Sequence, residues 1–511
     1  MSEVLYDVAI VGFGPSGAVA AGLLGQAGLK VYVCDMTHEV YDKPRAIALD
    51  HEILRVFQQL DVLADIEPFC EPFTDSCYYG VDGQLIRRMT MVEEPYPQTF
   101  TPSVVFTQPP VEEVLRSKVR TLPNVTVETG MKLASLSQTD EQAILELTSE
   151  TENKRIRAHY VIGCDGASST VRQQVGIQLE DLDFDEPWLV VDVKANEQGL
   201  AKLPTTSMQY CEPERPSSFI MGPGNHRRWE ISLNEGEDPA QAATPEGAWK
   251  LLSRWITPED GELWRQASYR FHALVANQWR AGRVFVAGDA AHQQPPFLGQ
   301  GMCQGVRDVT NLAWKINTVL TKTVTGPAAE ALLDSYSKER KEHVRQLTST
   351  IKSIGAVICE RDVEKARQRD QRLLDEHGGV VRPTPRQDVL PTLSGGLIYP
   401  TPGAGSLFPQ AWLQQGANKV RMDDVFGLGW RLVAHDSTQL PAYQALKAKL
   451  GFTQIALNDA DCQEADQVLA NWLTHNGVIA AVVRPDNYVF GTASDEQGLT
   501  DLLYALLDRM Q

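Results

Sequence analysis

A glycine-rich run near the start of the sequence has the spacing of a phosphate-binding turn. Gly12-Phe13-Gly14-Pro15-Ser16-Gly17 follows the apolar run 5–11 and opens a stretch of small, helix-compatible residues, 15–28. In this GxGxxG pattern Gly12 permits the tight turn, Gly14 lets a pyrophosphate approach the backbone, and Gly17 allows close helix–strand packing. The helix N-terminus offers free N–H groups and about half a positive charge. The sequence therefore predicts a dinucleotide-phosphate site made by Gly12, Gly14, Pro15, Ser16 and Gly17.

Asp35 ends the second apolar strand, 30–35, and provides the next part of that site. A carboxylate at this position can accept hydrogen bonds from both ribose hydroxyls of an adenosine, and it disfavours a 2′-phosphate there. The pattern does not distinguish FAD from NAD, because both contain adenosine diphosphate. A turn that merely connects two elements is the alternative interpretation.

A second strand end, far along the chain, favours FAD. The apolar strand 283–289 ends in Ala287-Gly288-Asp289, and Gly299-Gln300-Gly301 opens a long helix at 300–320. One extended cofactor that touches two distant strand ends is more consistent with FAD than with NAD. Asp289 is placed to accept a hydrogen bond from a ribityl hydroxyl. The helix N-terminus can stabilise negative charge on the N1–C2 carbonyl edge of a reduced flavin.

The elements that must position these residues predict an α/β fold. The strand–helix–strand opening indicates a parallel, Rossmann-like sheet with a right-handed crossover. Short β-like runs from 187 to 274 predict a mostly antiparallel sheet, inserted between two pieces of the first domain. Further helices are expected at 326–350 and 357–377, the latter with a solvated charged face. The expected domains are an FAD-binding domain in two parts, 1–180 (with a β excursion near 75–105) and 276–385, a substrate-binding sheet, 181–275, and a C-terminal domain, 395–511.

The C-terminal part follows a Pro/Gly-rich stretch, Val381 to Pro409, that is typical of a linker. Strands are expected at 428–434, 452–457, 478–484 and 487–492, and helices at 440–449, 465–475 and 496–510. This βαβαββα order resembles a thioredoxin fold. Its lone cysteine, Cys462, cannot run dithiol exchange, so a structural or interfacial role is expected.

Composition excludes several classes of protein. The chain has 511 residues, with 66 Asp+Glu against 47 Lys+Arg and a formal net charge of −19, so nucleic-acid binding is disfavoured. The eight cysteines form no CxxC and no zinc pattern with the histidines, so reduced thiols and no metal site are expected. The uncharged stretch Val8 to Leu29 is rich in glycine, contains Pro15 and is preceded by no Lys or Arg, which makes a poor membrane span or signal peptide. A cytoplasmic protein is expected, and its oligomeric state is left open, with a homodimer as the candidate.

Three motifs together carry a family resemblance. GFGPSG (12–17), CDGASSTVR (164–172) and GDAAHQQPPFLGQGMCQGVRDVTNLAWK (288–315) resemble the class A flavoprotein aromatic hydroxylases. With KPRAIALDHEILR (43–55) and the thioredoxin-like tail, the chain is most similar to the branch that contains 3-(3-hydroxyphenyl)propionate hydroxylases and phenol hydroxylases. The resemblance extends over nearly the whole chain, and its motifs are specific for the superfamily but weak on substrate.

The resemblance implies roles for residues beyond the first glycines. Arg45 and Gln108 correspond to residues near the pyrophosphate and ribityl chain, and Asp165 and Arg172 would serve both flavin and a transient nicotinamide nucleotide. Two departures are Asp35 in place of the commoner Glu and Cys303 in place of Asn. Asp165 could alternatively cap a turn. The implied FAD-binding residues are Gly12, Gly14, Pro15, Ser16, Gly17, Asp35, Arg45, Gln108, Asp165, Arg172, Gly288, Asp289, Pro296, Gly299, Gly301 and Met302.

The expected activity is that of an FAD-dependent monooxygenase. It would consume NADH or NADPH and O2 and hydroxylate a phenolic or related aromatic substrate through a flavin C4a-hydroperoxide, with the PPF turn, 295–297, and the inserted sheet excluding water. Candidate catalytic residues are Pro296, Tyr210, His226, Tyr269 and His272. Arg215, Arg227 or Arg228 could pair with a substrate carboxylate, or be solvated. A structural role is favoured for His292.

Three other functions remain open at this stage. A nicotinamide dehydrogenase with the same opening motif would purify colourless. A non-catalytic flavoprotein module would bind FAD but would show no phenol-stimulated consumption of NAD(P)H. A flavin monooxygenase with a Baeyer–Villiger outcome would use the same oxygen chemistry on a different substrate.

Overall fold

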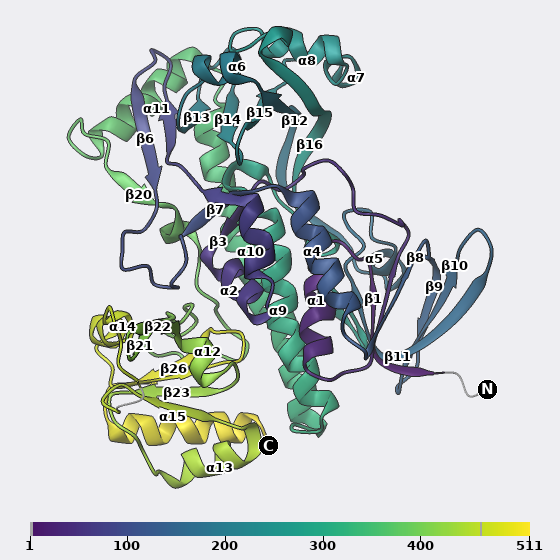
Figure 1. Ribbon diagram of the computed structural model, residues 1–511, viewed down its shortest axis with the longest axis vertical. Helices are drawn as coiled ribbons and strands as arrows, with labels where there is room; N and C mark the ends of the chain where they lie inside the picture. Colours follow the sequence, from purple (N-terminus) through teal and green to yellow (C-terminus); the bar gives the residue numbers. More distant parts are fainter. Residues whose placement is uncertain (1–3, 460–461) are drawn as a thin grey trace.

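The computed structural model describes residues 4–459 and 462–511, which form three regions (Figure 1). A largely parallel sheet with helices packed on it forms the first. A larger sheet lies above it in the view, and a smaller α/β domain lies at the lower left. Two long helices, α9 (Gly301–Leu320) and α10 (Gly326–Cys359), run through the centre. The mixed α/β fold class predicted from the sequence is confirmed.

The first sheet has the order β17-β18-β11-β1-β2-β8, and β10 and β9 extend it antiparallel to β11. Its central strand β1 contains Val8, Ala9 and Ile10, which are fully buried, as expected for a parallel strand covered by helices on both faces. Helix α1 (Pro15–Gln26) makes the crossover between β1 and β2. The strands are β1 (Leu5–Val11), β2 (Val31–Asp35), β8 (Val125–Thr129), β9 (Lys132–Gln138), β10 (Ala143–Thr148), β11 (Asn153–Gly163), β17 (Arg280–Ala281) and β18 (Val284–Val286).

A small antiparallel sheet and several helices surround the first sheet. The small sheet, in the order β3-β7-β4, brings residues 48–50 beside residues 103–106. Its strands are β3 (Ala48–Asp50), β4 (Cys70–Pro72) and β7 (Ser103–Phe106), and the helices are α2 (His51–Gln59), α3 (Leu63–Ile66), α4 (Gln108–Arg120) and α5 (Thr170–Gln174).

The second sheet has nine strands in the order β19-β16-β12-β15-β14-β13-β5-β6-β20. It is antiparallel except for the pairs β13·β5 and β20·β6, so the predicted excursion near 75–105 contributes two of its strands. The strands are β5 (Ser76–Tyr79), β6 (Leu85–Thr90), β12 (Leu179–Ala195), β13 (Ser207–Tyr210), β14 (Ser217–Met221), β15 (His226–Ser232), β16 (Gly261–Ala276), β19 (His292–Gln293) and β20 (Pro383–Pro385). The accompanying helices are α6 (Glu197–Lys202), α7 (Pro239–Ala242), α8 (Pro245–Leu252) and α11 (Val363–Asp375).

The two faces of this sheet bury different clusters, because side chains alternate along each strand. On the outer face, Leu189, Trp229 and Ile231 pack with Leu252 of α8. On the inner face, Trp188 packs with Phe297 and with the apolar side of α10. The inner face is therefore the one turned toward the first sheet and the PPF turn.

Three expectations need correction. The predicted linker between 381 and 409 is partly structured, because β20 pairs with β6 and adds a strand to the second sheet. The predicted helix 326–350 continues to Cys359 as α10, since Leu347, Ile351 and Ile358 keep its inner side buried. The charged helix expected at 357–377 is shorter, at α11.

The C-terminal domain has the predicted thioredoxin-like topology. Its sheet order is β24-β23-β25-β26, with β23 parallel to β24 and antiparallel to β25. Cys462 is buried in the core of this domain. The elements are β21 (Trp412–Gln415), β22 (Asn418–Arg421), α12 (Met422–Phe426), β23 (Arg431–Ala434), α13 (Pro441–Leu450), β24 (Thr453–Ala456), α14 (Val468–Asn476), β25 (Ala480–Val483), β26 (Val489–Ala493) and α15 (Glu496–Arg509).

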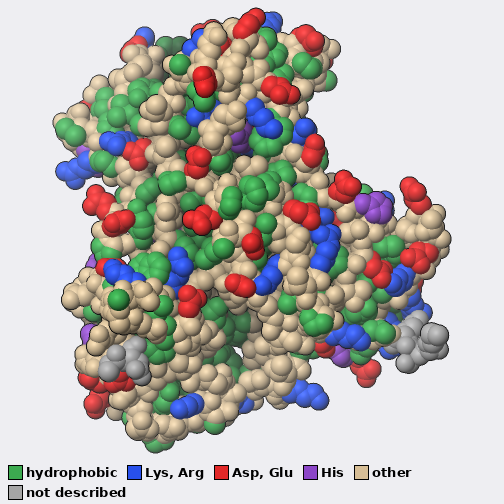
Figure 2. Space-filling model, in the orientation of Figure 1, with side chains coloured by type: hydrophobic (Ala, Val, Ile, Leu, Met, Phe, Trp, Pro, Cys, Tyr) green, Lys and Arg blue, Asp and Glu red, His purple; other side chains and the backbone are tan. Residues whose placement is uncertain are grey.

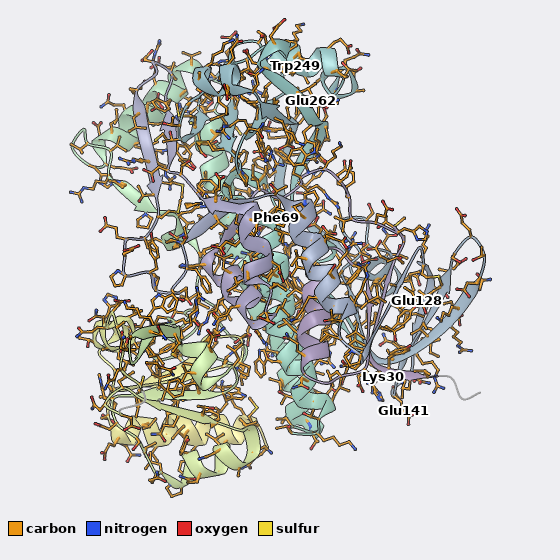
Figure 3. The ribbon with its side chains drawn as sticks, viewed as in Figure 1. Lys30, Phe69, Glu128, Glu141, Trp249 and Glu262 are labelled. Atoms are coloured by element: carbon orange, nitrogen blue, oxygen red, sulfur yellow. The ribbon has the colours of Figure 1, made fainter. Side chains whose placement is uncertain are left out.

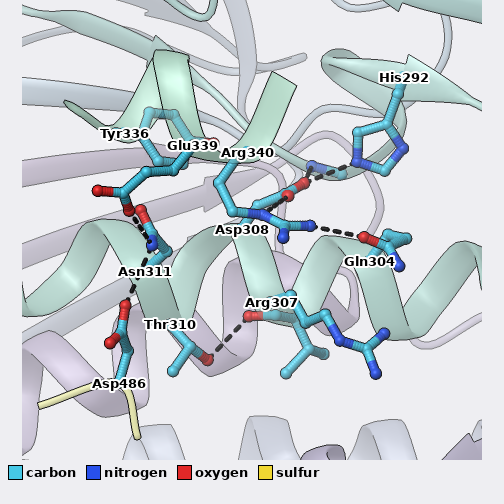
Figure 4. A network of polar contacts seen from close by, with 12 residues as sticks. His292, Gln304, Arg307, Asp308, Thr310, Asn311, Tyr336, Glu339, Arg340 and Asp486 are labelled. Atoms are coloured by element: carbon cyan, nitrogen blue, oxygen red, sulfur yellow. Dashed lines mark hydrogen bonds and ion pairs between the residues drawn. The ribbon is translucent and has the colours of Figure 1, made fainter. Parts of the chain in front are cut away.

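A buried polar network fastens this domain to the two central helices (Figure 4). Arg484 donates to Glu339 of α10 at 2.8 Å and to Asp486 at 2.6 Å. Asn311 of α9 donates to the carboxylates of both Glu339 and Asp486. The hairpin between β25 and β26 thus braces α9, whose N-terminus lies at the candidate site.

The molecular surface mixes charges of both signs. Figure 2 shows acidic and basic side chains interspersed over the visible face. Within residues 4–459 and 462–511, no helix is long and apolar enough to cross a membrane.

Candidate functional site

The glycine-rich turn adopts a backbone that side chains would block at two of its three glycines. Gly12 has φ +101°, and a Cβ there would lie 2.3 Å from the Cys164 carbonyl oxygen. A Cβ at Gly17 would lie 2.0 Å from the Gly12 carbonyl oxygen, whereas a Cβ at Gly14 would meet no atom within 4 Å. Close packing therefore requires Gly12 and Gly17, and the open space beside Gly14 is where a phosphate can approach the backbone.

Helix α1 begins at this turn with its N-terminus available to an anion. Gly14 is the N-cap and Pro15 starts the helix, and no described side chain caps the helix N-terminus. Ser16 packs instead against the second motif: a Cβ at Gly288 or at Gly305 would lie 2.8 Å or 2.3 Å from its Oγ. Ser16 thus holds the two motifs together at their closest approach.

Asp35 fastens the end of β2 to the glycine-rich turn. Its Oδ2 accepts from the Phe13 N–H at 2.7 Å, and its Oδ1 accepts from the backbone and hydroxyl of Thr37, both at 2.7 Å. Both lone pairs of Oδ1 are used by Thr37, whereas Oδ2 keeps one that can accept a hydrogen bond from a ribose hydroxyl.

Gln108 positions the segment that carries Arg45. Its Oε1 accepts from the backbone N–H groups of Arg45 at 3.0 Å and Ala46 at 2.6 Å, and its amide donates to Glu112 at 3.2 Å. The exposed Arg45 side chain lies over the Tyr41 ring at 5.2 Å. Gln108 therefore acts on the site through the backbone, and Arg45 is the member of the pair that can reach a ligand.

The central motif links β11 to the Gly288–Ala290 turn. Asp165 accepts from the Ser169 hydroxyl and the Val171 N–H and so caps α5, which was the alternative interpretation of this residue. Arg172 is buried and donates to the carbonyl oxygens of Ala290 at 3.0 Å and Ala167 at 2.9 Å. Direct contact of either side chain with a flavin or a nicotinamide stays a prediction.

Buried residues around Asp308 hold the turn that carries Asp289, whereas the Asp289 carboxylate itself has no protein partner among the described residues. Asp308 accepts from the Gly288 N–H at 3.0 Å, from His292 at 2.7 Å and from Arg340 at 2.9 Å (Figure 4). His292 is therefore buried within a structural network, as favoured from the sequence. The Asp289 side chain is reached by solvent and has no hydrogen bond or ion pair among the described residues. Surrounding protein raises the pKa of its carboxyl by desolvation, opposed by Arg45 and His292.

An Asp289→Ala variant is expected to fold normally and to bind FAD about 10–100-fold more weakly. The change removes no contact within the protein, but it leaves a ribityl hydroxyl unpaired at a cost of about 1–3 kcal/mol. Titration of the apoprotein with FAD measures the affinity, and the melting temperature reports folding. Asp289→Asn keeps an acceptor and is the matched control. Unchanged FAD retention by Asp289→Ala on dialysis would contradict the assignment.

The start of α9 lies against β3. Pro296 begins a short 3₁₀ turn, and Gly299 has φ +61° with a Cβ position only 3.3 Å from the Ala48 Cβ. The buried Cys303 thiol donates to the Ala48 carbonyl oxygen at 3.7 Å. A Cβ at Gly301 would meet nothing within 4 Å, so the backbone there is open to a ligand, with the half-buried Met302 beside it.

The inner face of the second sheet is fastened to the Arg45 segment by buried charges. Asp192 accepts from His226 and Arg228, each at 2.7 Å. Arg228 also donates to the carbonyl oxygens of Arg45 at 2.7 Å and Pro44 at 3.0 Å, and Arg265 donates to Pro44 at 2.7 Å. His226 and Arg228 are therefore structural, and the expectations of a base and of a carboxylate-binding cation at these positions need correction.

The other polar candidates are likewise occupied or misplaced. Tyr210 lies on the outer face of the sheet, as does Ser217, its direct partner on β14. Its ring packs there on the ring of Trp255, with the two ring centroids 5.5 Å apart. Tyr269 shares the inner face with Trp188 and accepts from Arg265. Arg215 pairs with Glu237 at 2.8 Å, and Arg227 donates to the Gly224 carbonyl oxygen at 2.9 Å. His272 lies 3.7 Å from Asp185, beyond hydrogen-bond distance, near the surface of the sheet. The structure does not gather these residues into one catalytic cluster.

Glu230 is the residue that the sequence interpretation missed. It lies on β15, is 4% exposed, and has no hydrogen bond or ion pair within the part of the chain that the structure describes. Desolvation raises the pKa of its carboxyl to about 7. The alternation of residue types could have indicated Glu230. In the run 229–233 the apolar residues occupy one face of the strand and the acid occupies the other, and both faces of this strand are buried.

Comparison with known proteins gives the family and the fold. A family model described as "FAD binding domain" matches residues 5–350, and one described as "HcaD C-terminal domain" matches residues 405–509. The chain is 35% identical over 515 aligned positions to a "Probable NADH-specific resorcinol 4-hydroxylase" of Rhodococcus jostii, covering 98% of this chain and 94% of that one. It is 30% identical over 546 positions to a "3-(3-hydroxy-phenyl)propionate/3-hydroxycinnamic acid hydroxylase" of Burkholderia cenocepacia, covering 98% and 96%.

Two solved structures share the fold over the full length. The flavin-dependent monooxygenase PieE, solved with FAD and substrate, superposes with a TM-score of 0.80 at 20% identity and covers 100% of both chains. Aklavinone-11 hydroxylase, solved with FAD and aklavinone, gives a TM-score of 0.80 at 22% identity and covers 99% of this chain and 100% of the other. At these identities the likeness shows the fold alone.

Proposed function

Because the chain belongs to the FAD-binding-domain family that matches its residues 5–350, we propose that it is an FAD-dependent monooxygenase acting on a phenolic ring. It consumes O2 and a reduced nicotinamide, and it transfers one oxygen atom to the aromatic substrate. Its full-length relatives carry hydroxylase names, and the sequence similarity extends through the C-terminal domain. The activity is thus that of a flavin-dependent aromatic hydroxylase.

The residues present fit FAD at both ends of a long site. The open backbone at Gly14 and the carboxylate of Asp35 suit the adenosine diphosphate part. Asp289, free of protein partners among the described residues, suits the ribityl chain, and the open backbone at Gly301 suits the flavin ring edge. The exposed Asp289 carboxylate, which has no protein partner among the described residues, carries the assignment, because it is available to accept a hydrogen bond from a ribityl hydroxyl. When bound, FAD supplies the redox chemistry that activates O2.

Three groups position this site through contacts within the protein. Gln108 fixes the backbone at Arg45, Arg172 fixes the Gly288–Ala290 turn, and Ser16 holds α1 against α9. Arg45 would approach the pyrophosphate, and Pro296 would lie beside the flavin ring. Asp165 orders the loop that faces the nicotinamide.

The walls of the substrate space are apolar. Phe297 of the PPF turn packs edge-on against Trp188 at 5.5 Å and Phe184 at 5.9 Å. Ala48, Phe73 and Ile220 form a second apolar contact near Gly299. These side chains exclude water, which protects reactive oxygen species from wasteful decay.

Turnover with a panel of phenols tests the proposed function. The purified protein is expected to be yellow, and resorcinol or 3-(3-hydroxyphenyl)propionate is expected to stimulate NADH or NADPH oxidation. Oxygen uptake, peroxide release and product mass with ¹⁸O₂ are measured together, and NMR locates the new hydroxyl. A colourless protein that cannot be reconstituted with FAD indicates a dehydrogenase. A flavoprotein that consumes no nicotinamide with any phenol is non-catalytic.

The homodimer and the cytoplasmic location both stay predictions, and light scattering checks the homodimer.

A further inference from the structure

The inner face of the second sheet presents one acidic side chain that the interactions described so far do not use. Glu230 lies between Val190 and Ser218, its direct partners on the neighbouring strands. The residue is 4% exposed, and solvent still reaches its carboxylate oxygens. A buried carboxylate whose oxygens are accessible but have no partner in the described chain is placed to receive a donor from a ligand.

Neighbouring contacts place Glu230 on the wall of the proposed substrate space. Two residues earlier on β15, Arg228 reaches the backbone of Arg45 at 2.7 Å. Two residues later, Ser232 pairs with Trp188, which packs on Phe297 of the PPF turn. Glu230 therefore lies between the Arg45 segment and the PPF turn, which would border the pyrophosphate and the ring of FAD in the proposed arrangement.

A hydrogen-bond donor lies on the same face as Glu230. Gln209 pairs across the strands with Ser218, the residue directly opposite Glu230. The Ser218 hydroxyl donates to the Gln209 Oε1 at 2.5 Å, which turns the carbonyl end of that amide toward the serine. The Gln209 amide N–H₂ group has no hydrogen bond in the described structure. An acceptor and a donor are thus presented together on one wall.

Four arginines near this wall are held by the protein itself, and a fifth, Arg87, lies on the same face four strands from Glu230 and covers the Tyr78 ring at 5.7 Å. Arg228 and Arg265 serve Asp192 and the Pro44 carbonyl, and Arg386 donates to Leu298 and covers the Phe73 ring. Arg361 donates to Ser232 and Asn234. A substrate carboxylate would meet no uncommitted cation among these described side chains and would face the Glu230 carboxylate. The wall therefore favours an uncharged ligand that bears hydroxyl groups.

We propose that Glu230 binds a ring hydroxyl of an uncharged di- or polyhydroxylated benzene and accepts its proton during hydroxylation. The proposal rests on the function proposed above and specifies the substrate class and the base. The O–H bond breaks, its electron pair stays on the ring oxygen, and this phenolate character directs electrons to the ring carbon that takes oxygen from O2. The ring carbon then loses its own proton to solvent, and the proton on Glu230 returns to the ring oxygen. The reduced nicotinamide supplies the two electrons, and the second oxygen atom leaves as water.

The surroundings of Glu230 match this role at neutral pH. Desolvation and the charge of Asp192 raise the pKa of the carboxyl, Arg228 and Arg265 lower it, and together they leave this pKa at about 7. Both protonation states are therefore populated near pH 7, which is the condition under which a general base and conjugate acid work most efficiently.

Glu230→Gln tests the proposal, with Glu262→Gln as the matched control. Glu262 lies on β16 of the same sheet and is exposed (Figure 3). Both variants are expected to retain FAD and the wild-type melting temperature. With resorcinol, Glu230→Gln is expected to lose about 10²–10³-fold in kcat and the limb of the pH profile near 7, while the control keeps both. A nitro-substituted resorcinol, ionised at neutral pH, should restore the variant to near the wild-type rate. Wild-type kcat and pH profile in Glu230→Gln would overturn the proposal.

Binding measurements separate this proposal from the proposed function. Calorimetry of the FAD-loaded protein in buffers of different ionisation enthalpy reports the net protons exchanged with the buffer on resorcinol binding without turnover. Wild type is expected to exchange a proton with buffer and Glu230→Gln is not; equal exchange in both overturns the proposal.

Wild type is also expected to bind 3-ethylphenol at least about 10-fold more tightly than 3-(3-hydroxyphenyl)propionate. Tighter binding of the carboxylate overturns the inferred substrate class. Absence of phenol-stimulated turnover in wild type contradicts the proposed function alone, and calorimetry still decides the role of Glu230.

Discussion

Gly12→Ala is expected to yield a destabilised protein without bound flavin. Gly12 has φ +101°, a conformation that costs an L side chain about 1–2 kcal/mol, and the new Cβ would lie 2.3 Å from the Cys164 carbonyl oxygen. Relief of that overlap must displace the turn or β11, at a further cost of about 1–3 kcal/mol. The displaced turn also loses phosphate contacts. Two charge-assisted hydrogen bonds at about 1.5 kcal/mol each correspond to a loss of about 100-fold in FAD affinity.

Gly14→Ala is the matched control for this prediction. Gly14 has φ −66°, and its added Cβ would meet no protein atom within 4 Å. The apoprotein is therefore expected to keep its free energy of unfolding within about 0.5 kcal/mol, while FAD affinity falls because the Cβ occupies the phosphate side of the turn. Urea unfolding of the apoproteins and FAD titration give the two quantities. Wild-type stability and flavin content in Gly12→Ala would refute the proposed cradle.

Arg484→Met is expected to lower the free energy of unfolding by about 3–5 kcal/mol. Arg484 is fully buried and pairs with Glu339 at 2.8 Å and Asp486 at 2.6 Å. Its removal leaves two buried carboxylates with Lys315 as their one remaining cation among the described residues, beside hydrogen bonds from Asn311 and from backbone N–H groups. Because these groups join the C-terminal domain to α9 and α10, we also expect weaker retention of FAD at the α9 N-terminus.

The control for Arg484→Met is Arg270→Met, which breaks an exposed pair. Arg270 and Asp185 are 58% and 49% exposed, and loss of such a pair costs about 0–1 kcal/mol. Chemical denaturation of the full chain, followed by tryptophan and flavin fluorescence, measures both variants. Equal, small effects of the two substitutions would show that the buried network does not hold the domains together.

The same network predicts how stability depends on pH. Burial raises the pKa of Glu339, but the charges of Arg484 and Lys315 outweigh it and hold that pKa below the ordinary value. A carboxyl group with a lowered folded-state pKa stabilises the fold above its unfolded value of about 4.3, and this contribution is lost as the pH falls. The difference in stability between wild type and Arg484→Met is therefore expected to shrink below about pH 4.

Local motifs allowed much of the cofactor site to be predicted. The GxGxxG turn and the acid that ends β2 are close in sequence, and their geometry follows from one strand–turn–helix unit. The glycine conformations at Gly12 and Gly299 and the thioredoxin-like order of the C-terminal elements follow the same logic. In each case neighbouring residues and backbone sterics decide the outcome.

The polar residues of the sheet could not be interpreted in this way. Tyr210 and Glu230 lie on neighbouring parts of one sheet, yet they face opposite sides, and only the register β13–β14–β15 decides which side each one takes. In the sequence Arg228 is a candidate for a free cation. In the fold it donates at 2.7 Å to the backbone carbonyl oxygen of Arg45, which is 183 residues away in sequence.

The sequence by itself determined the nucleotide turn, the two acids at strand ends and the order of the elements, because these depend on residues within a few positions of one another. Tertiary structure alone decided that His226 and Arg228 are structural and that Glu230 has no protein partner among the described residues. The physical reason is that a charged side chain takes its role from what compensates its burial, and those partners come from strands and loops far apart in the chain.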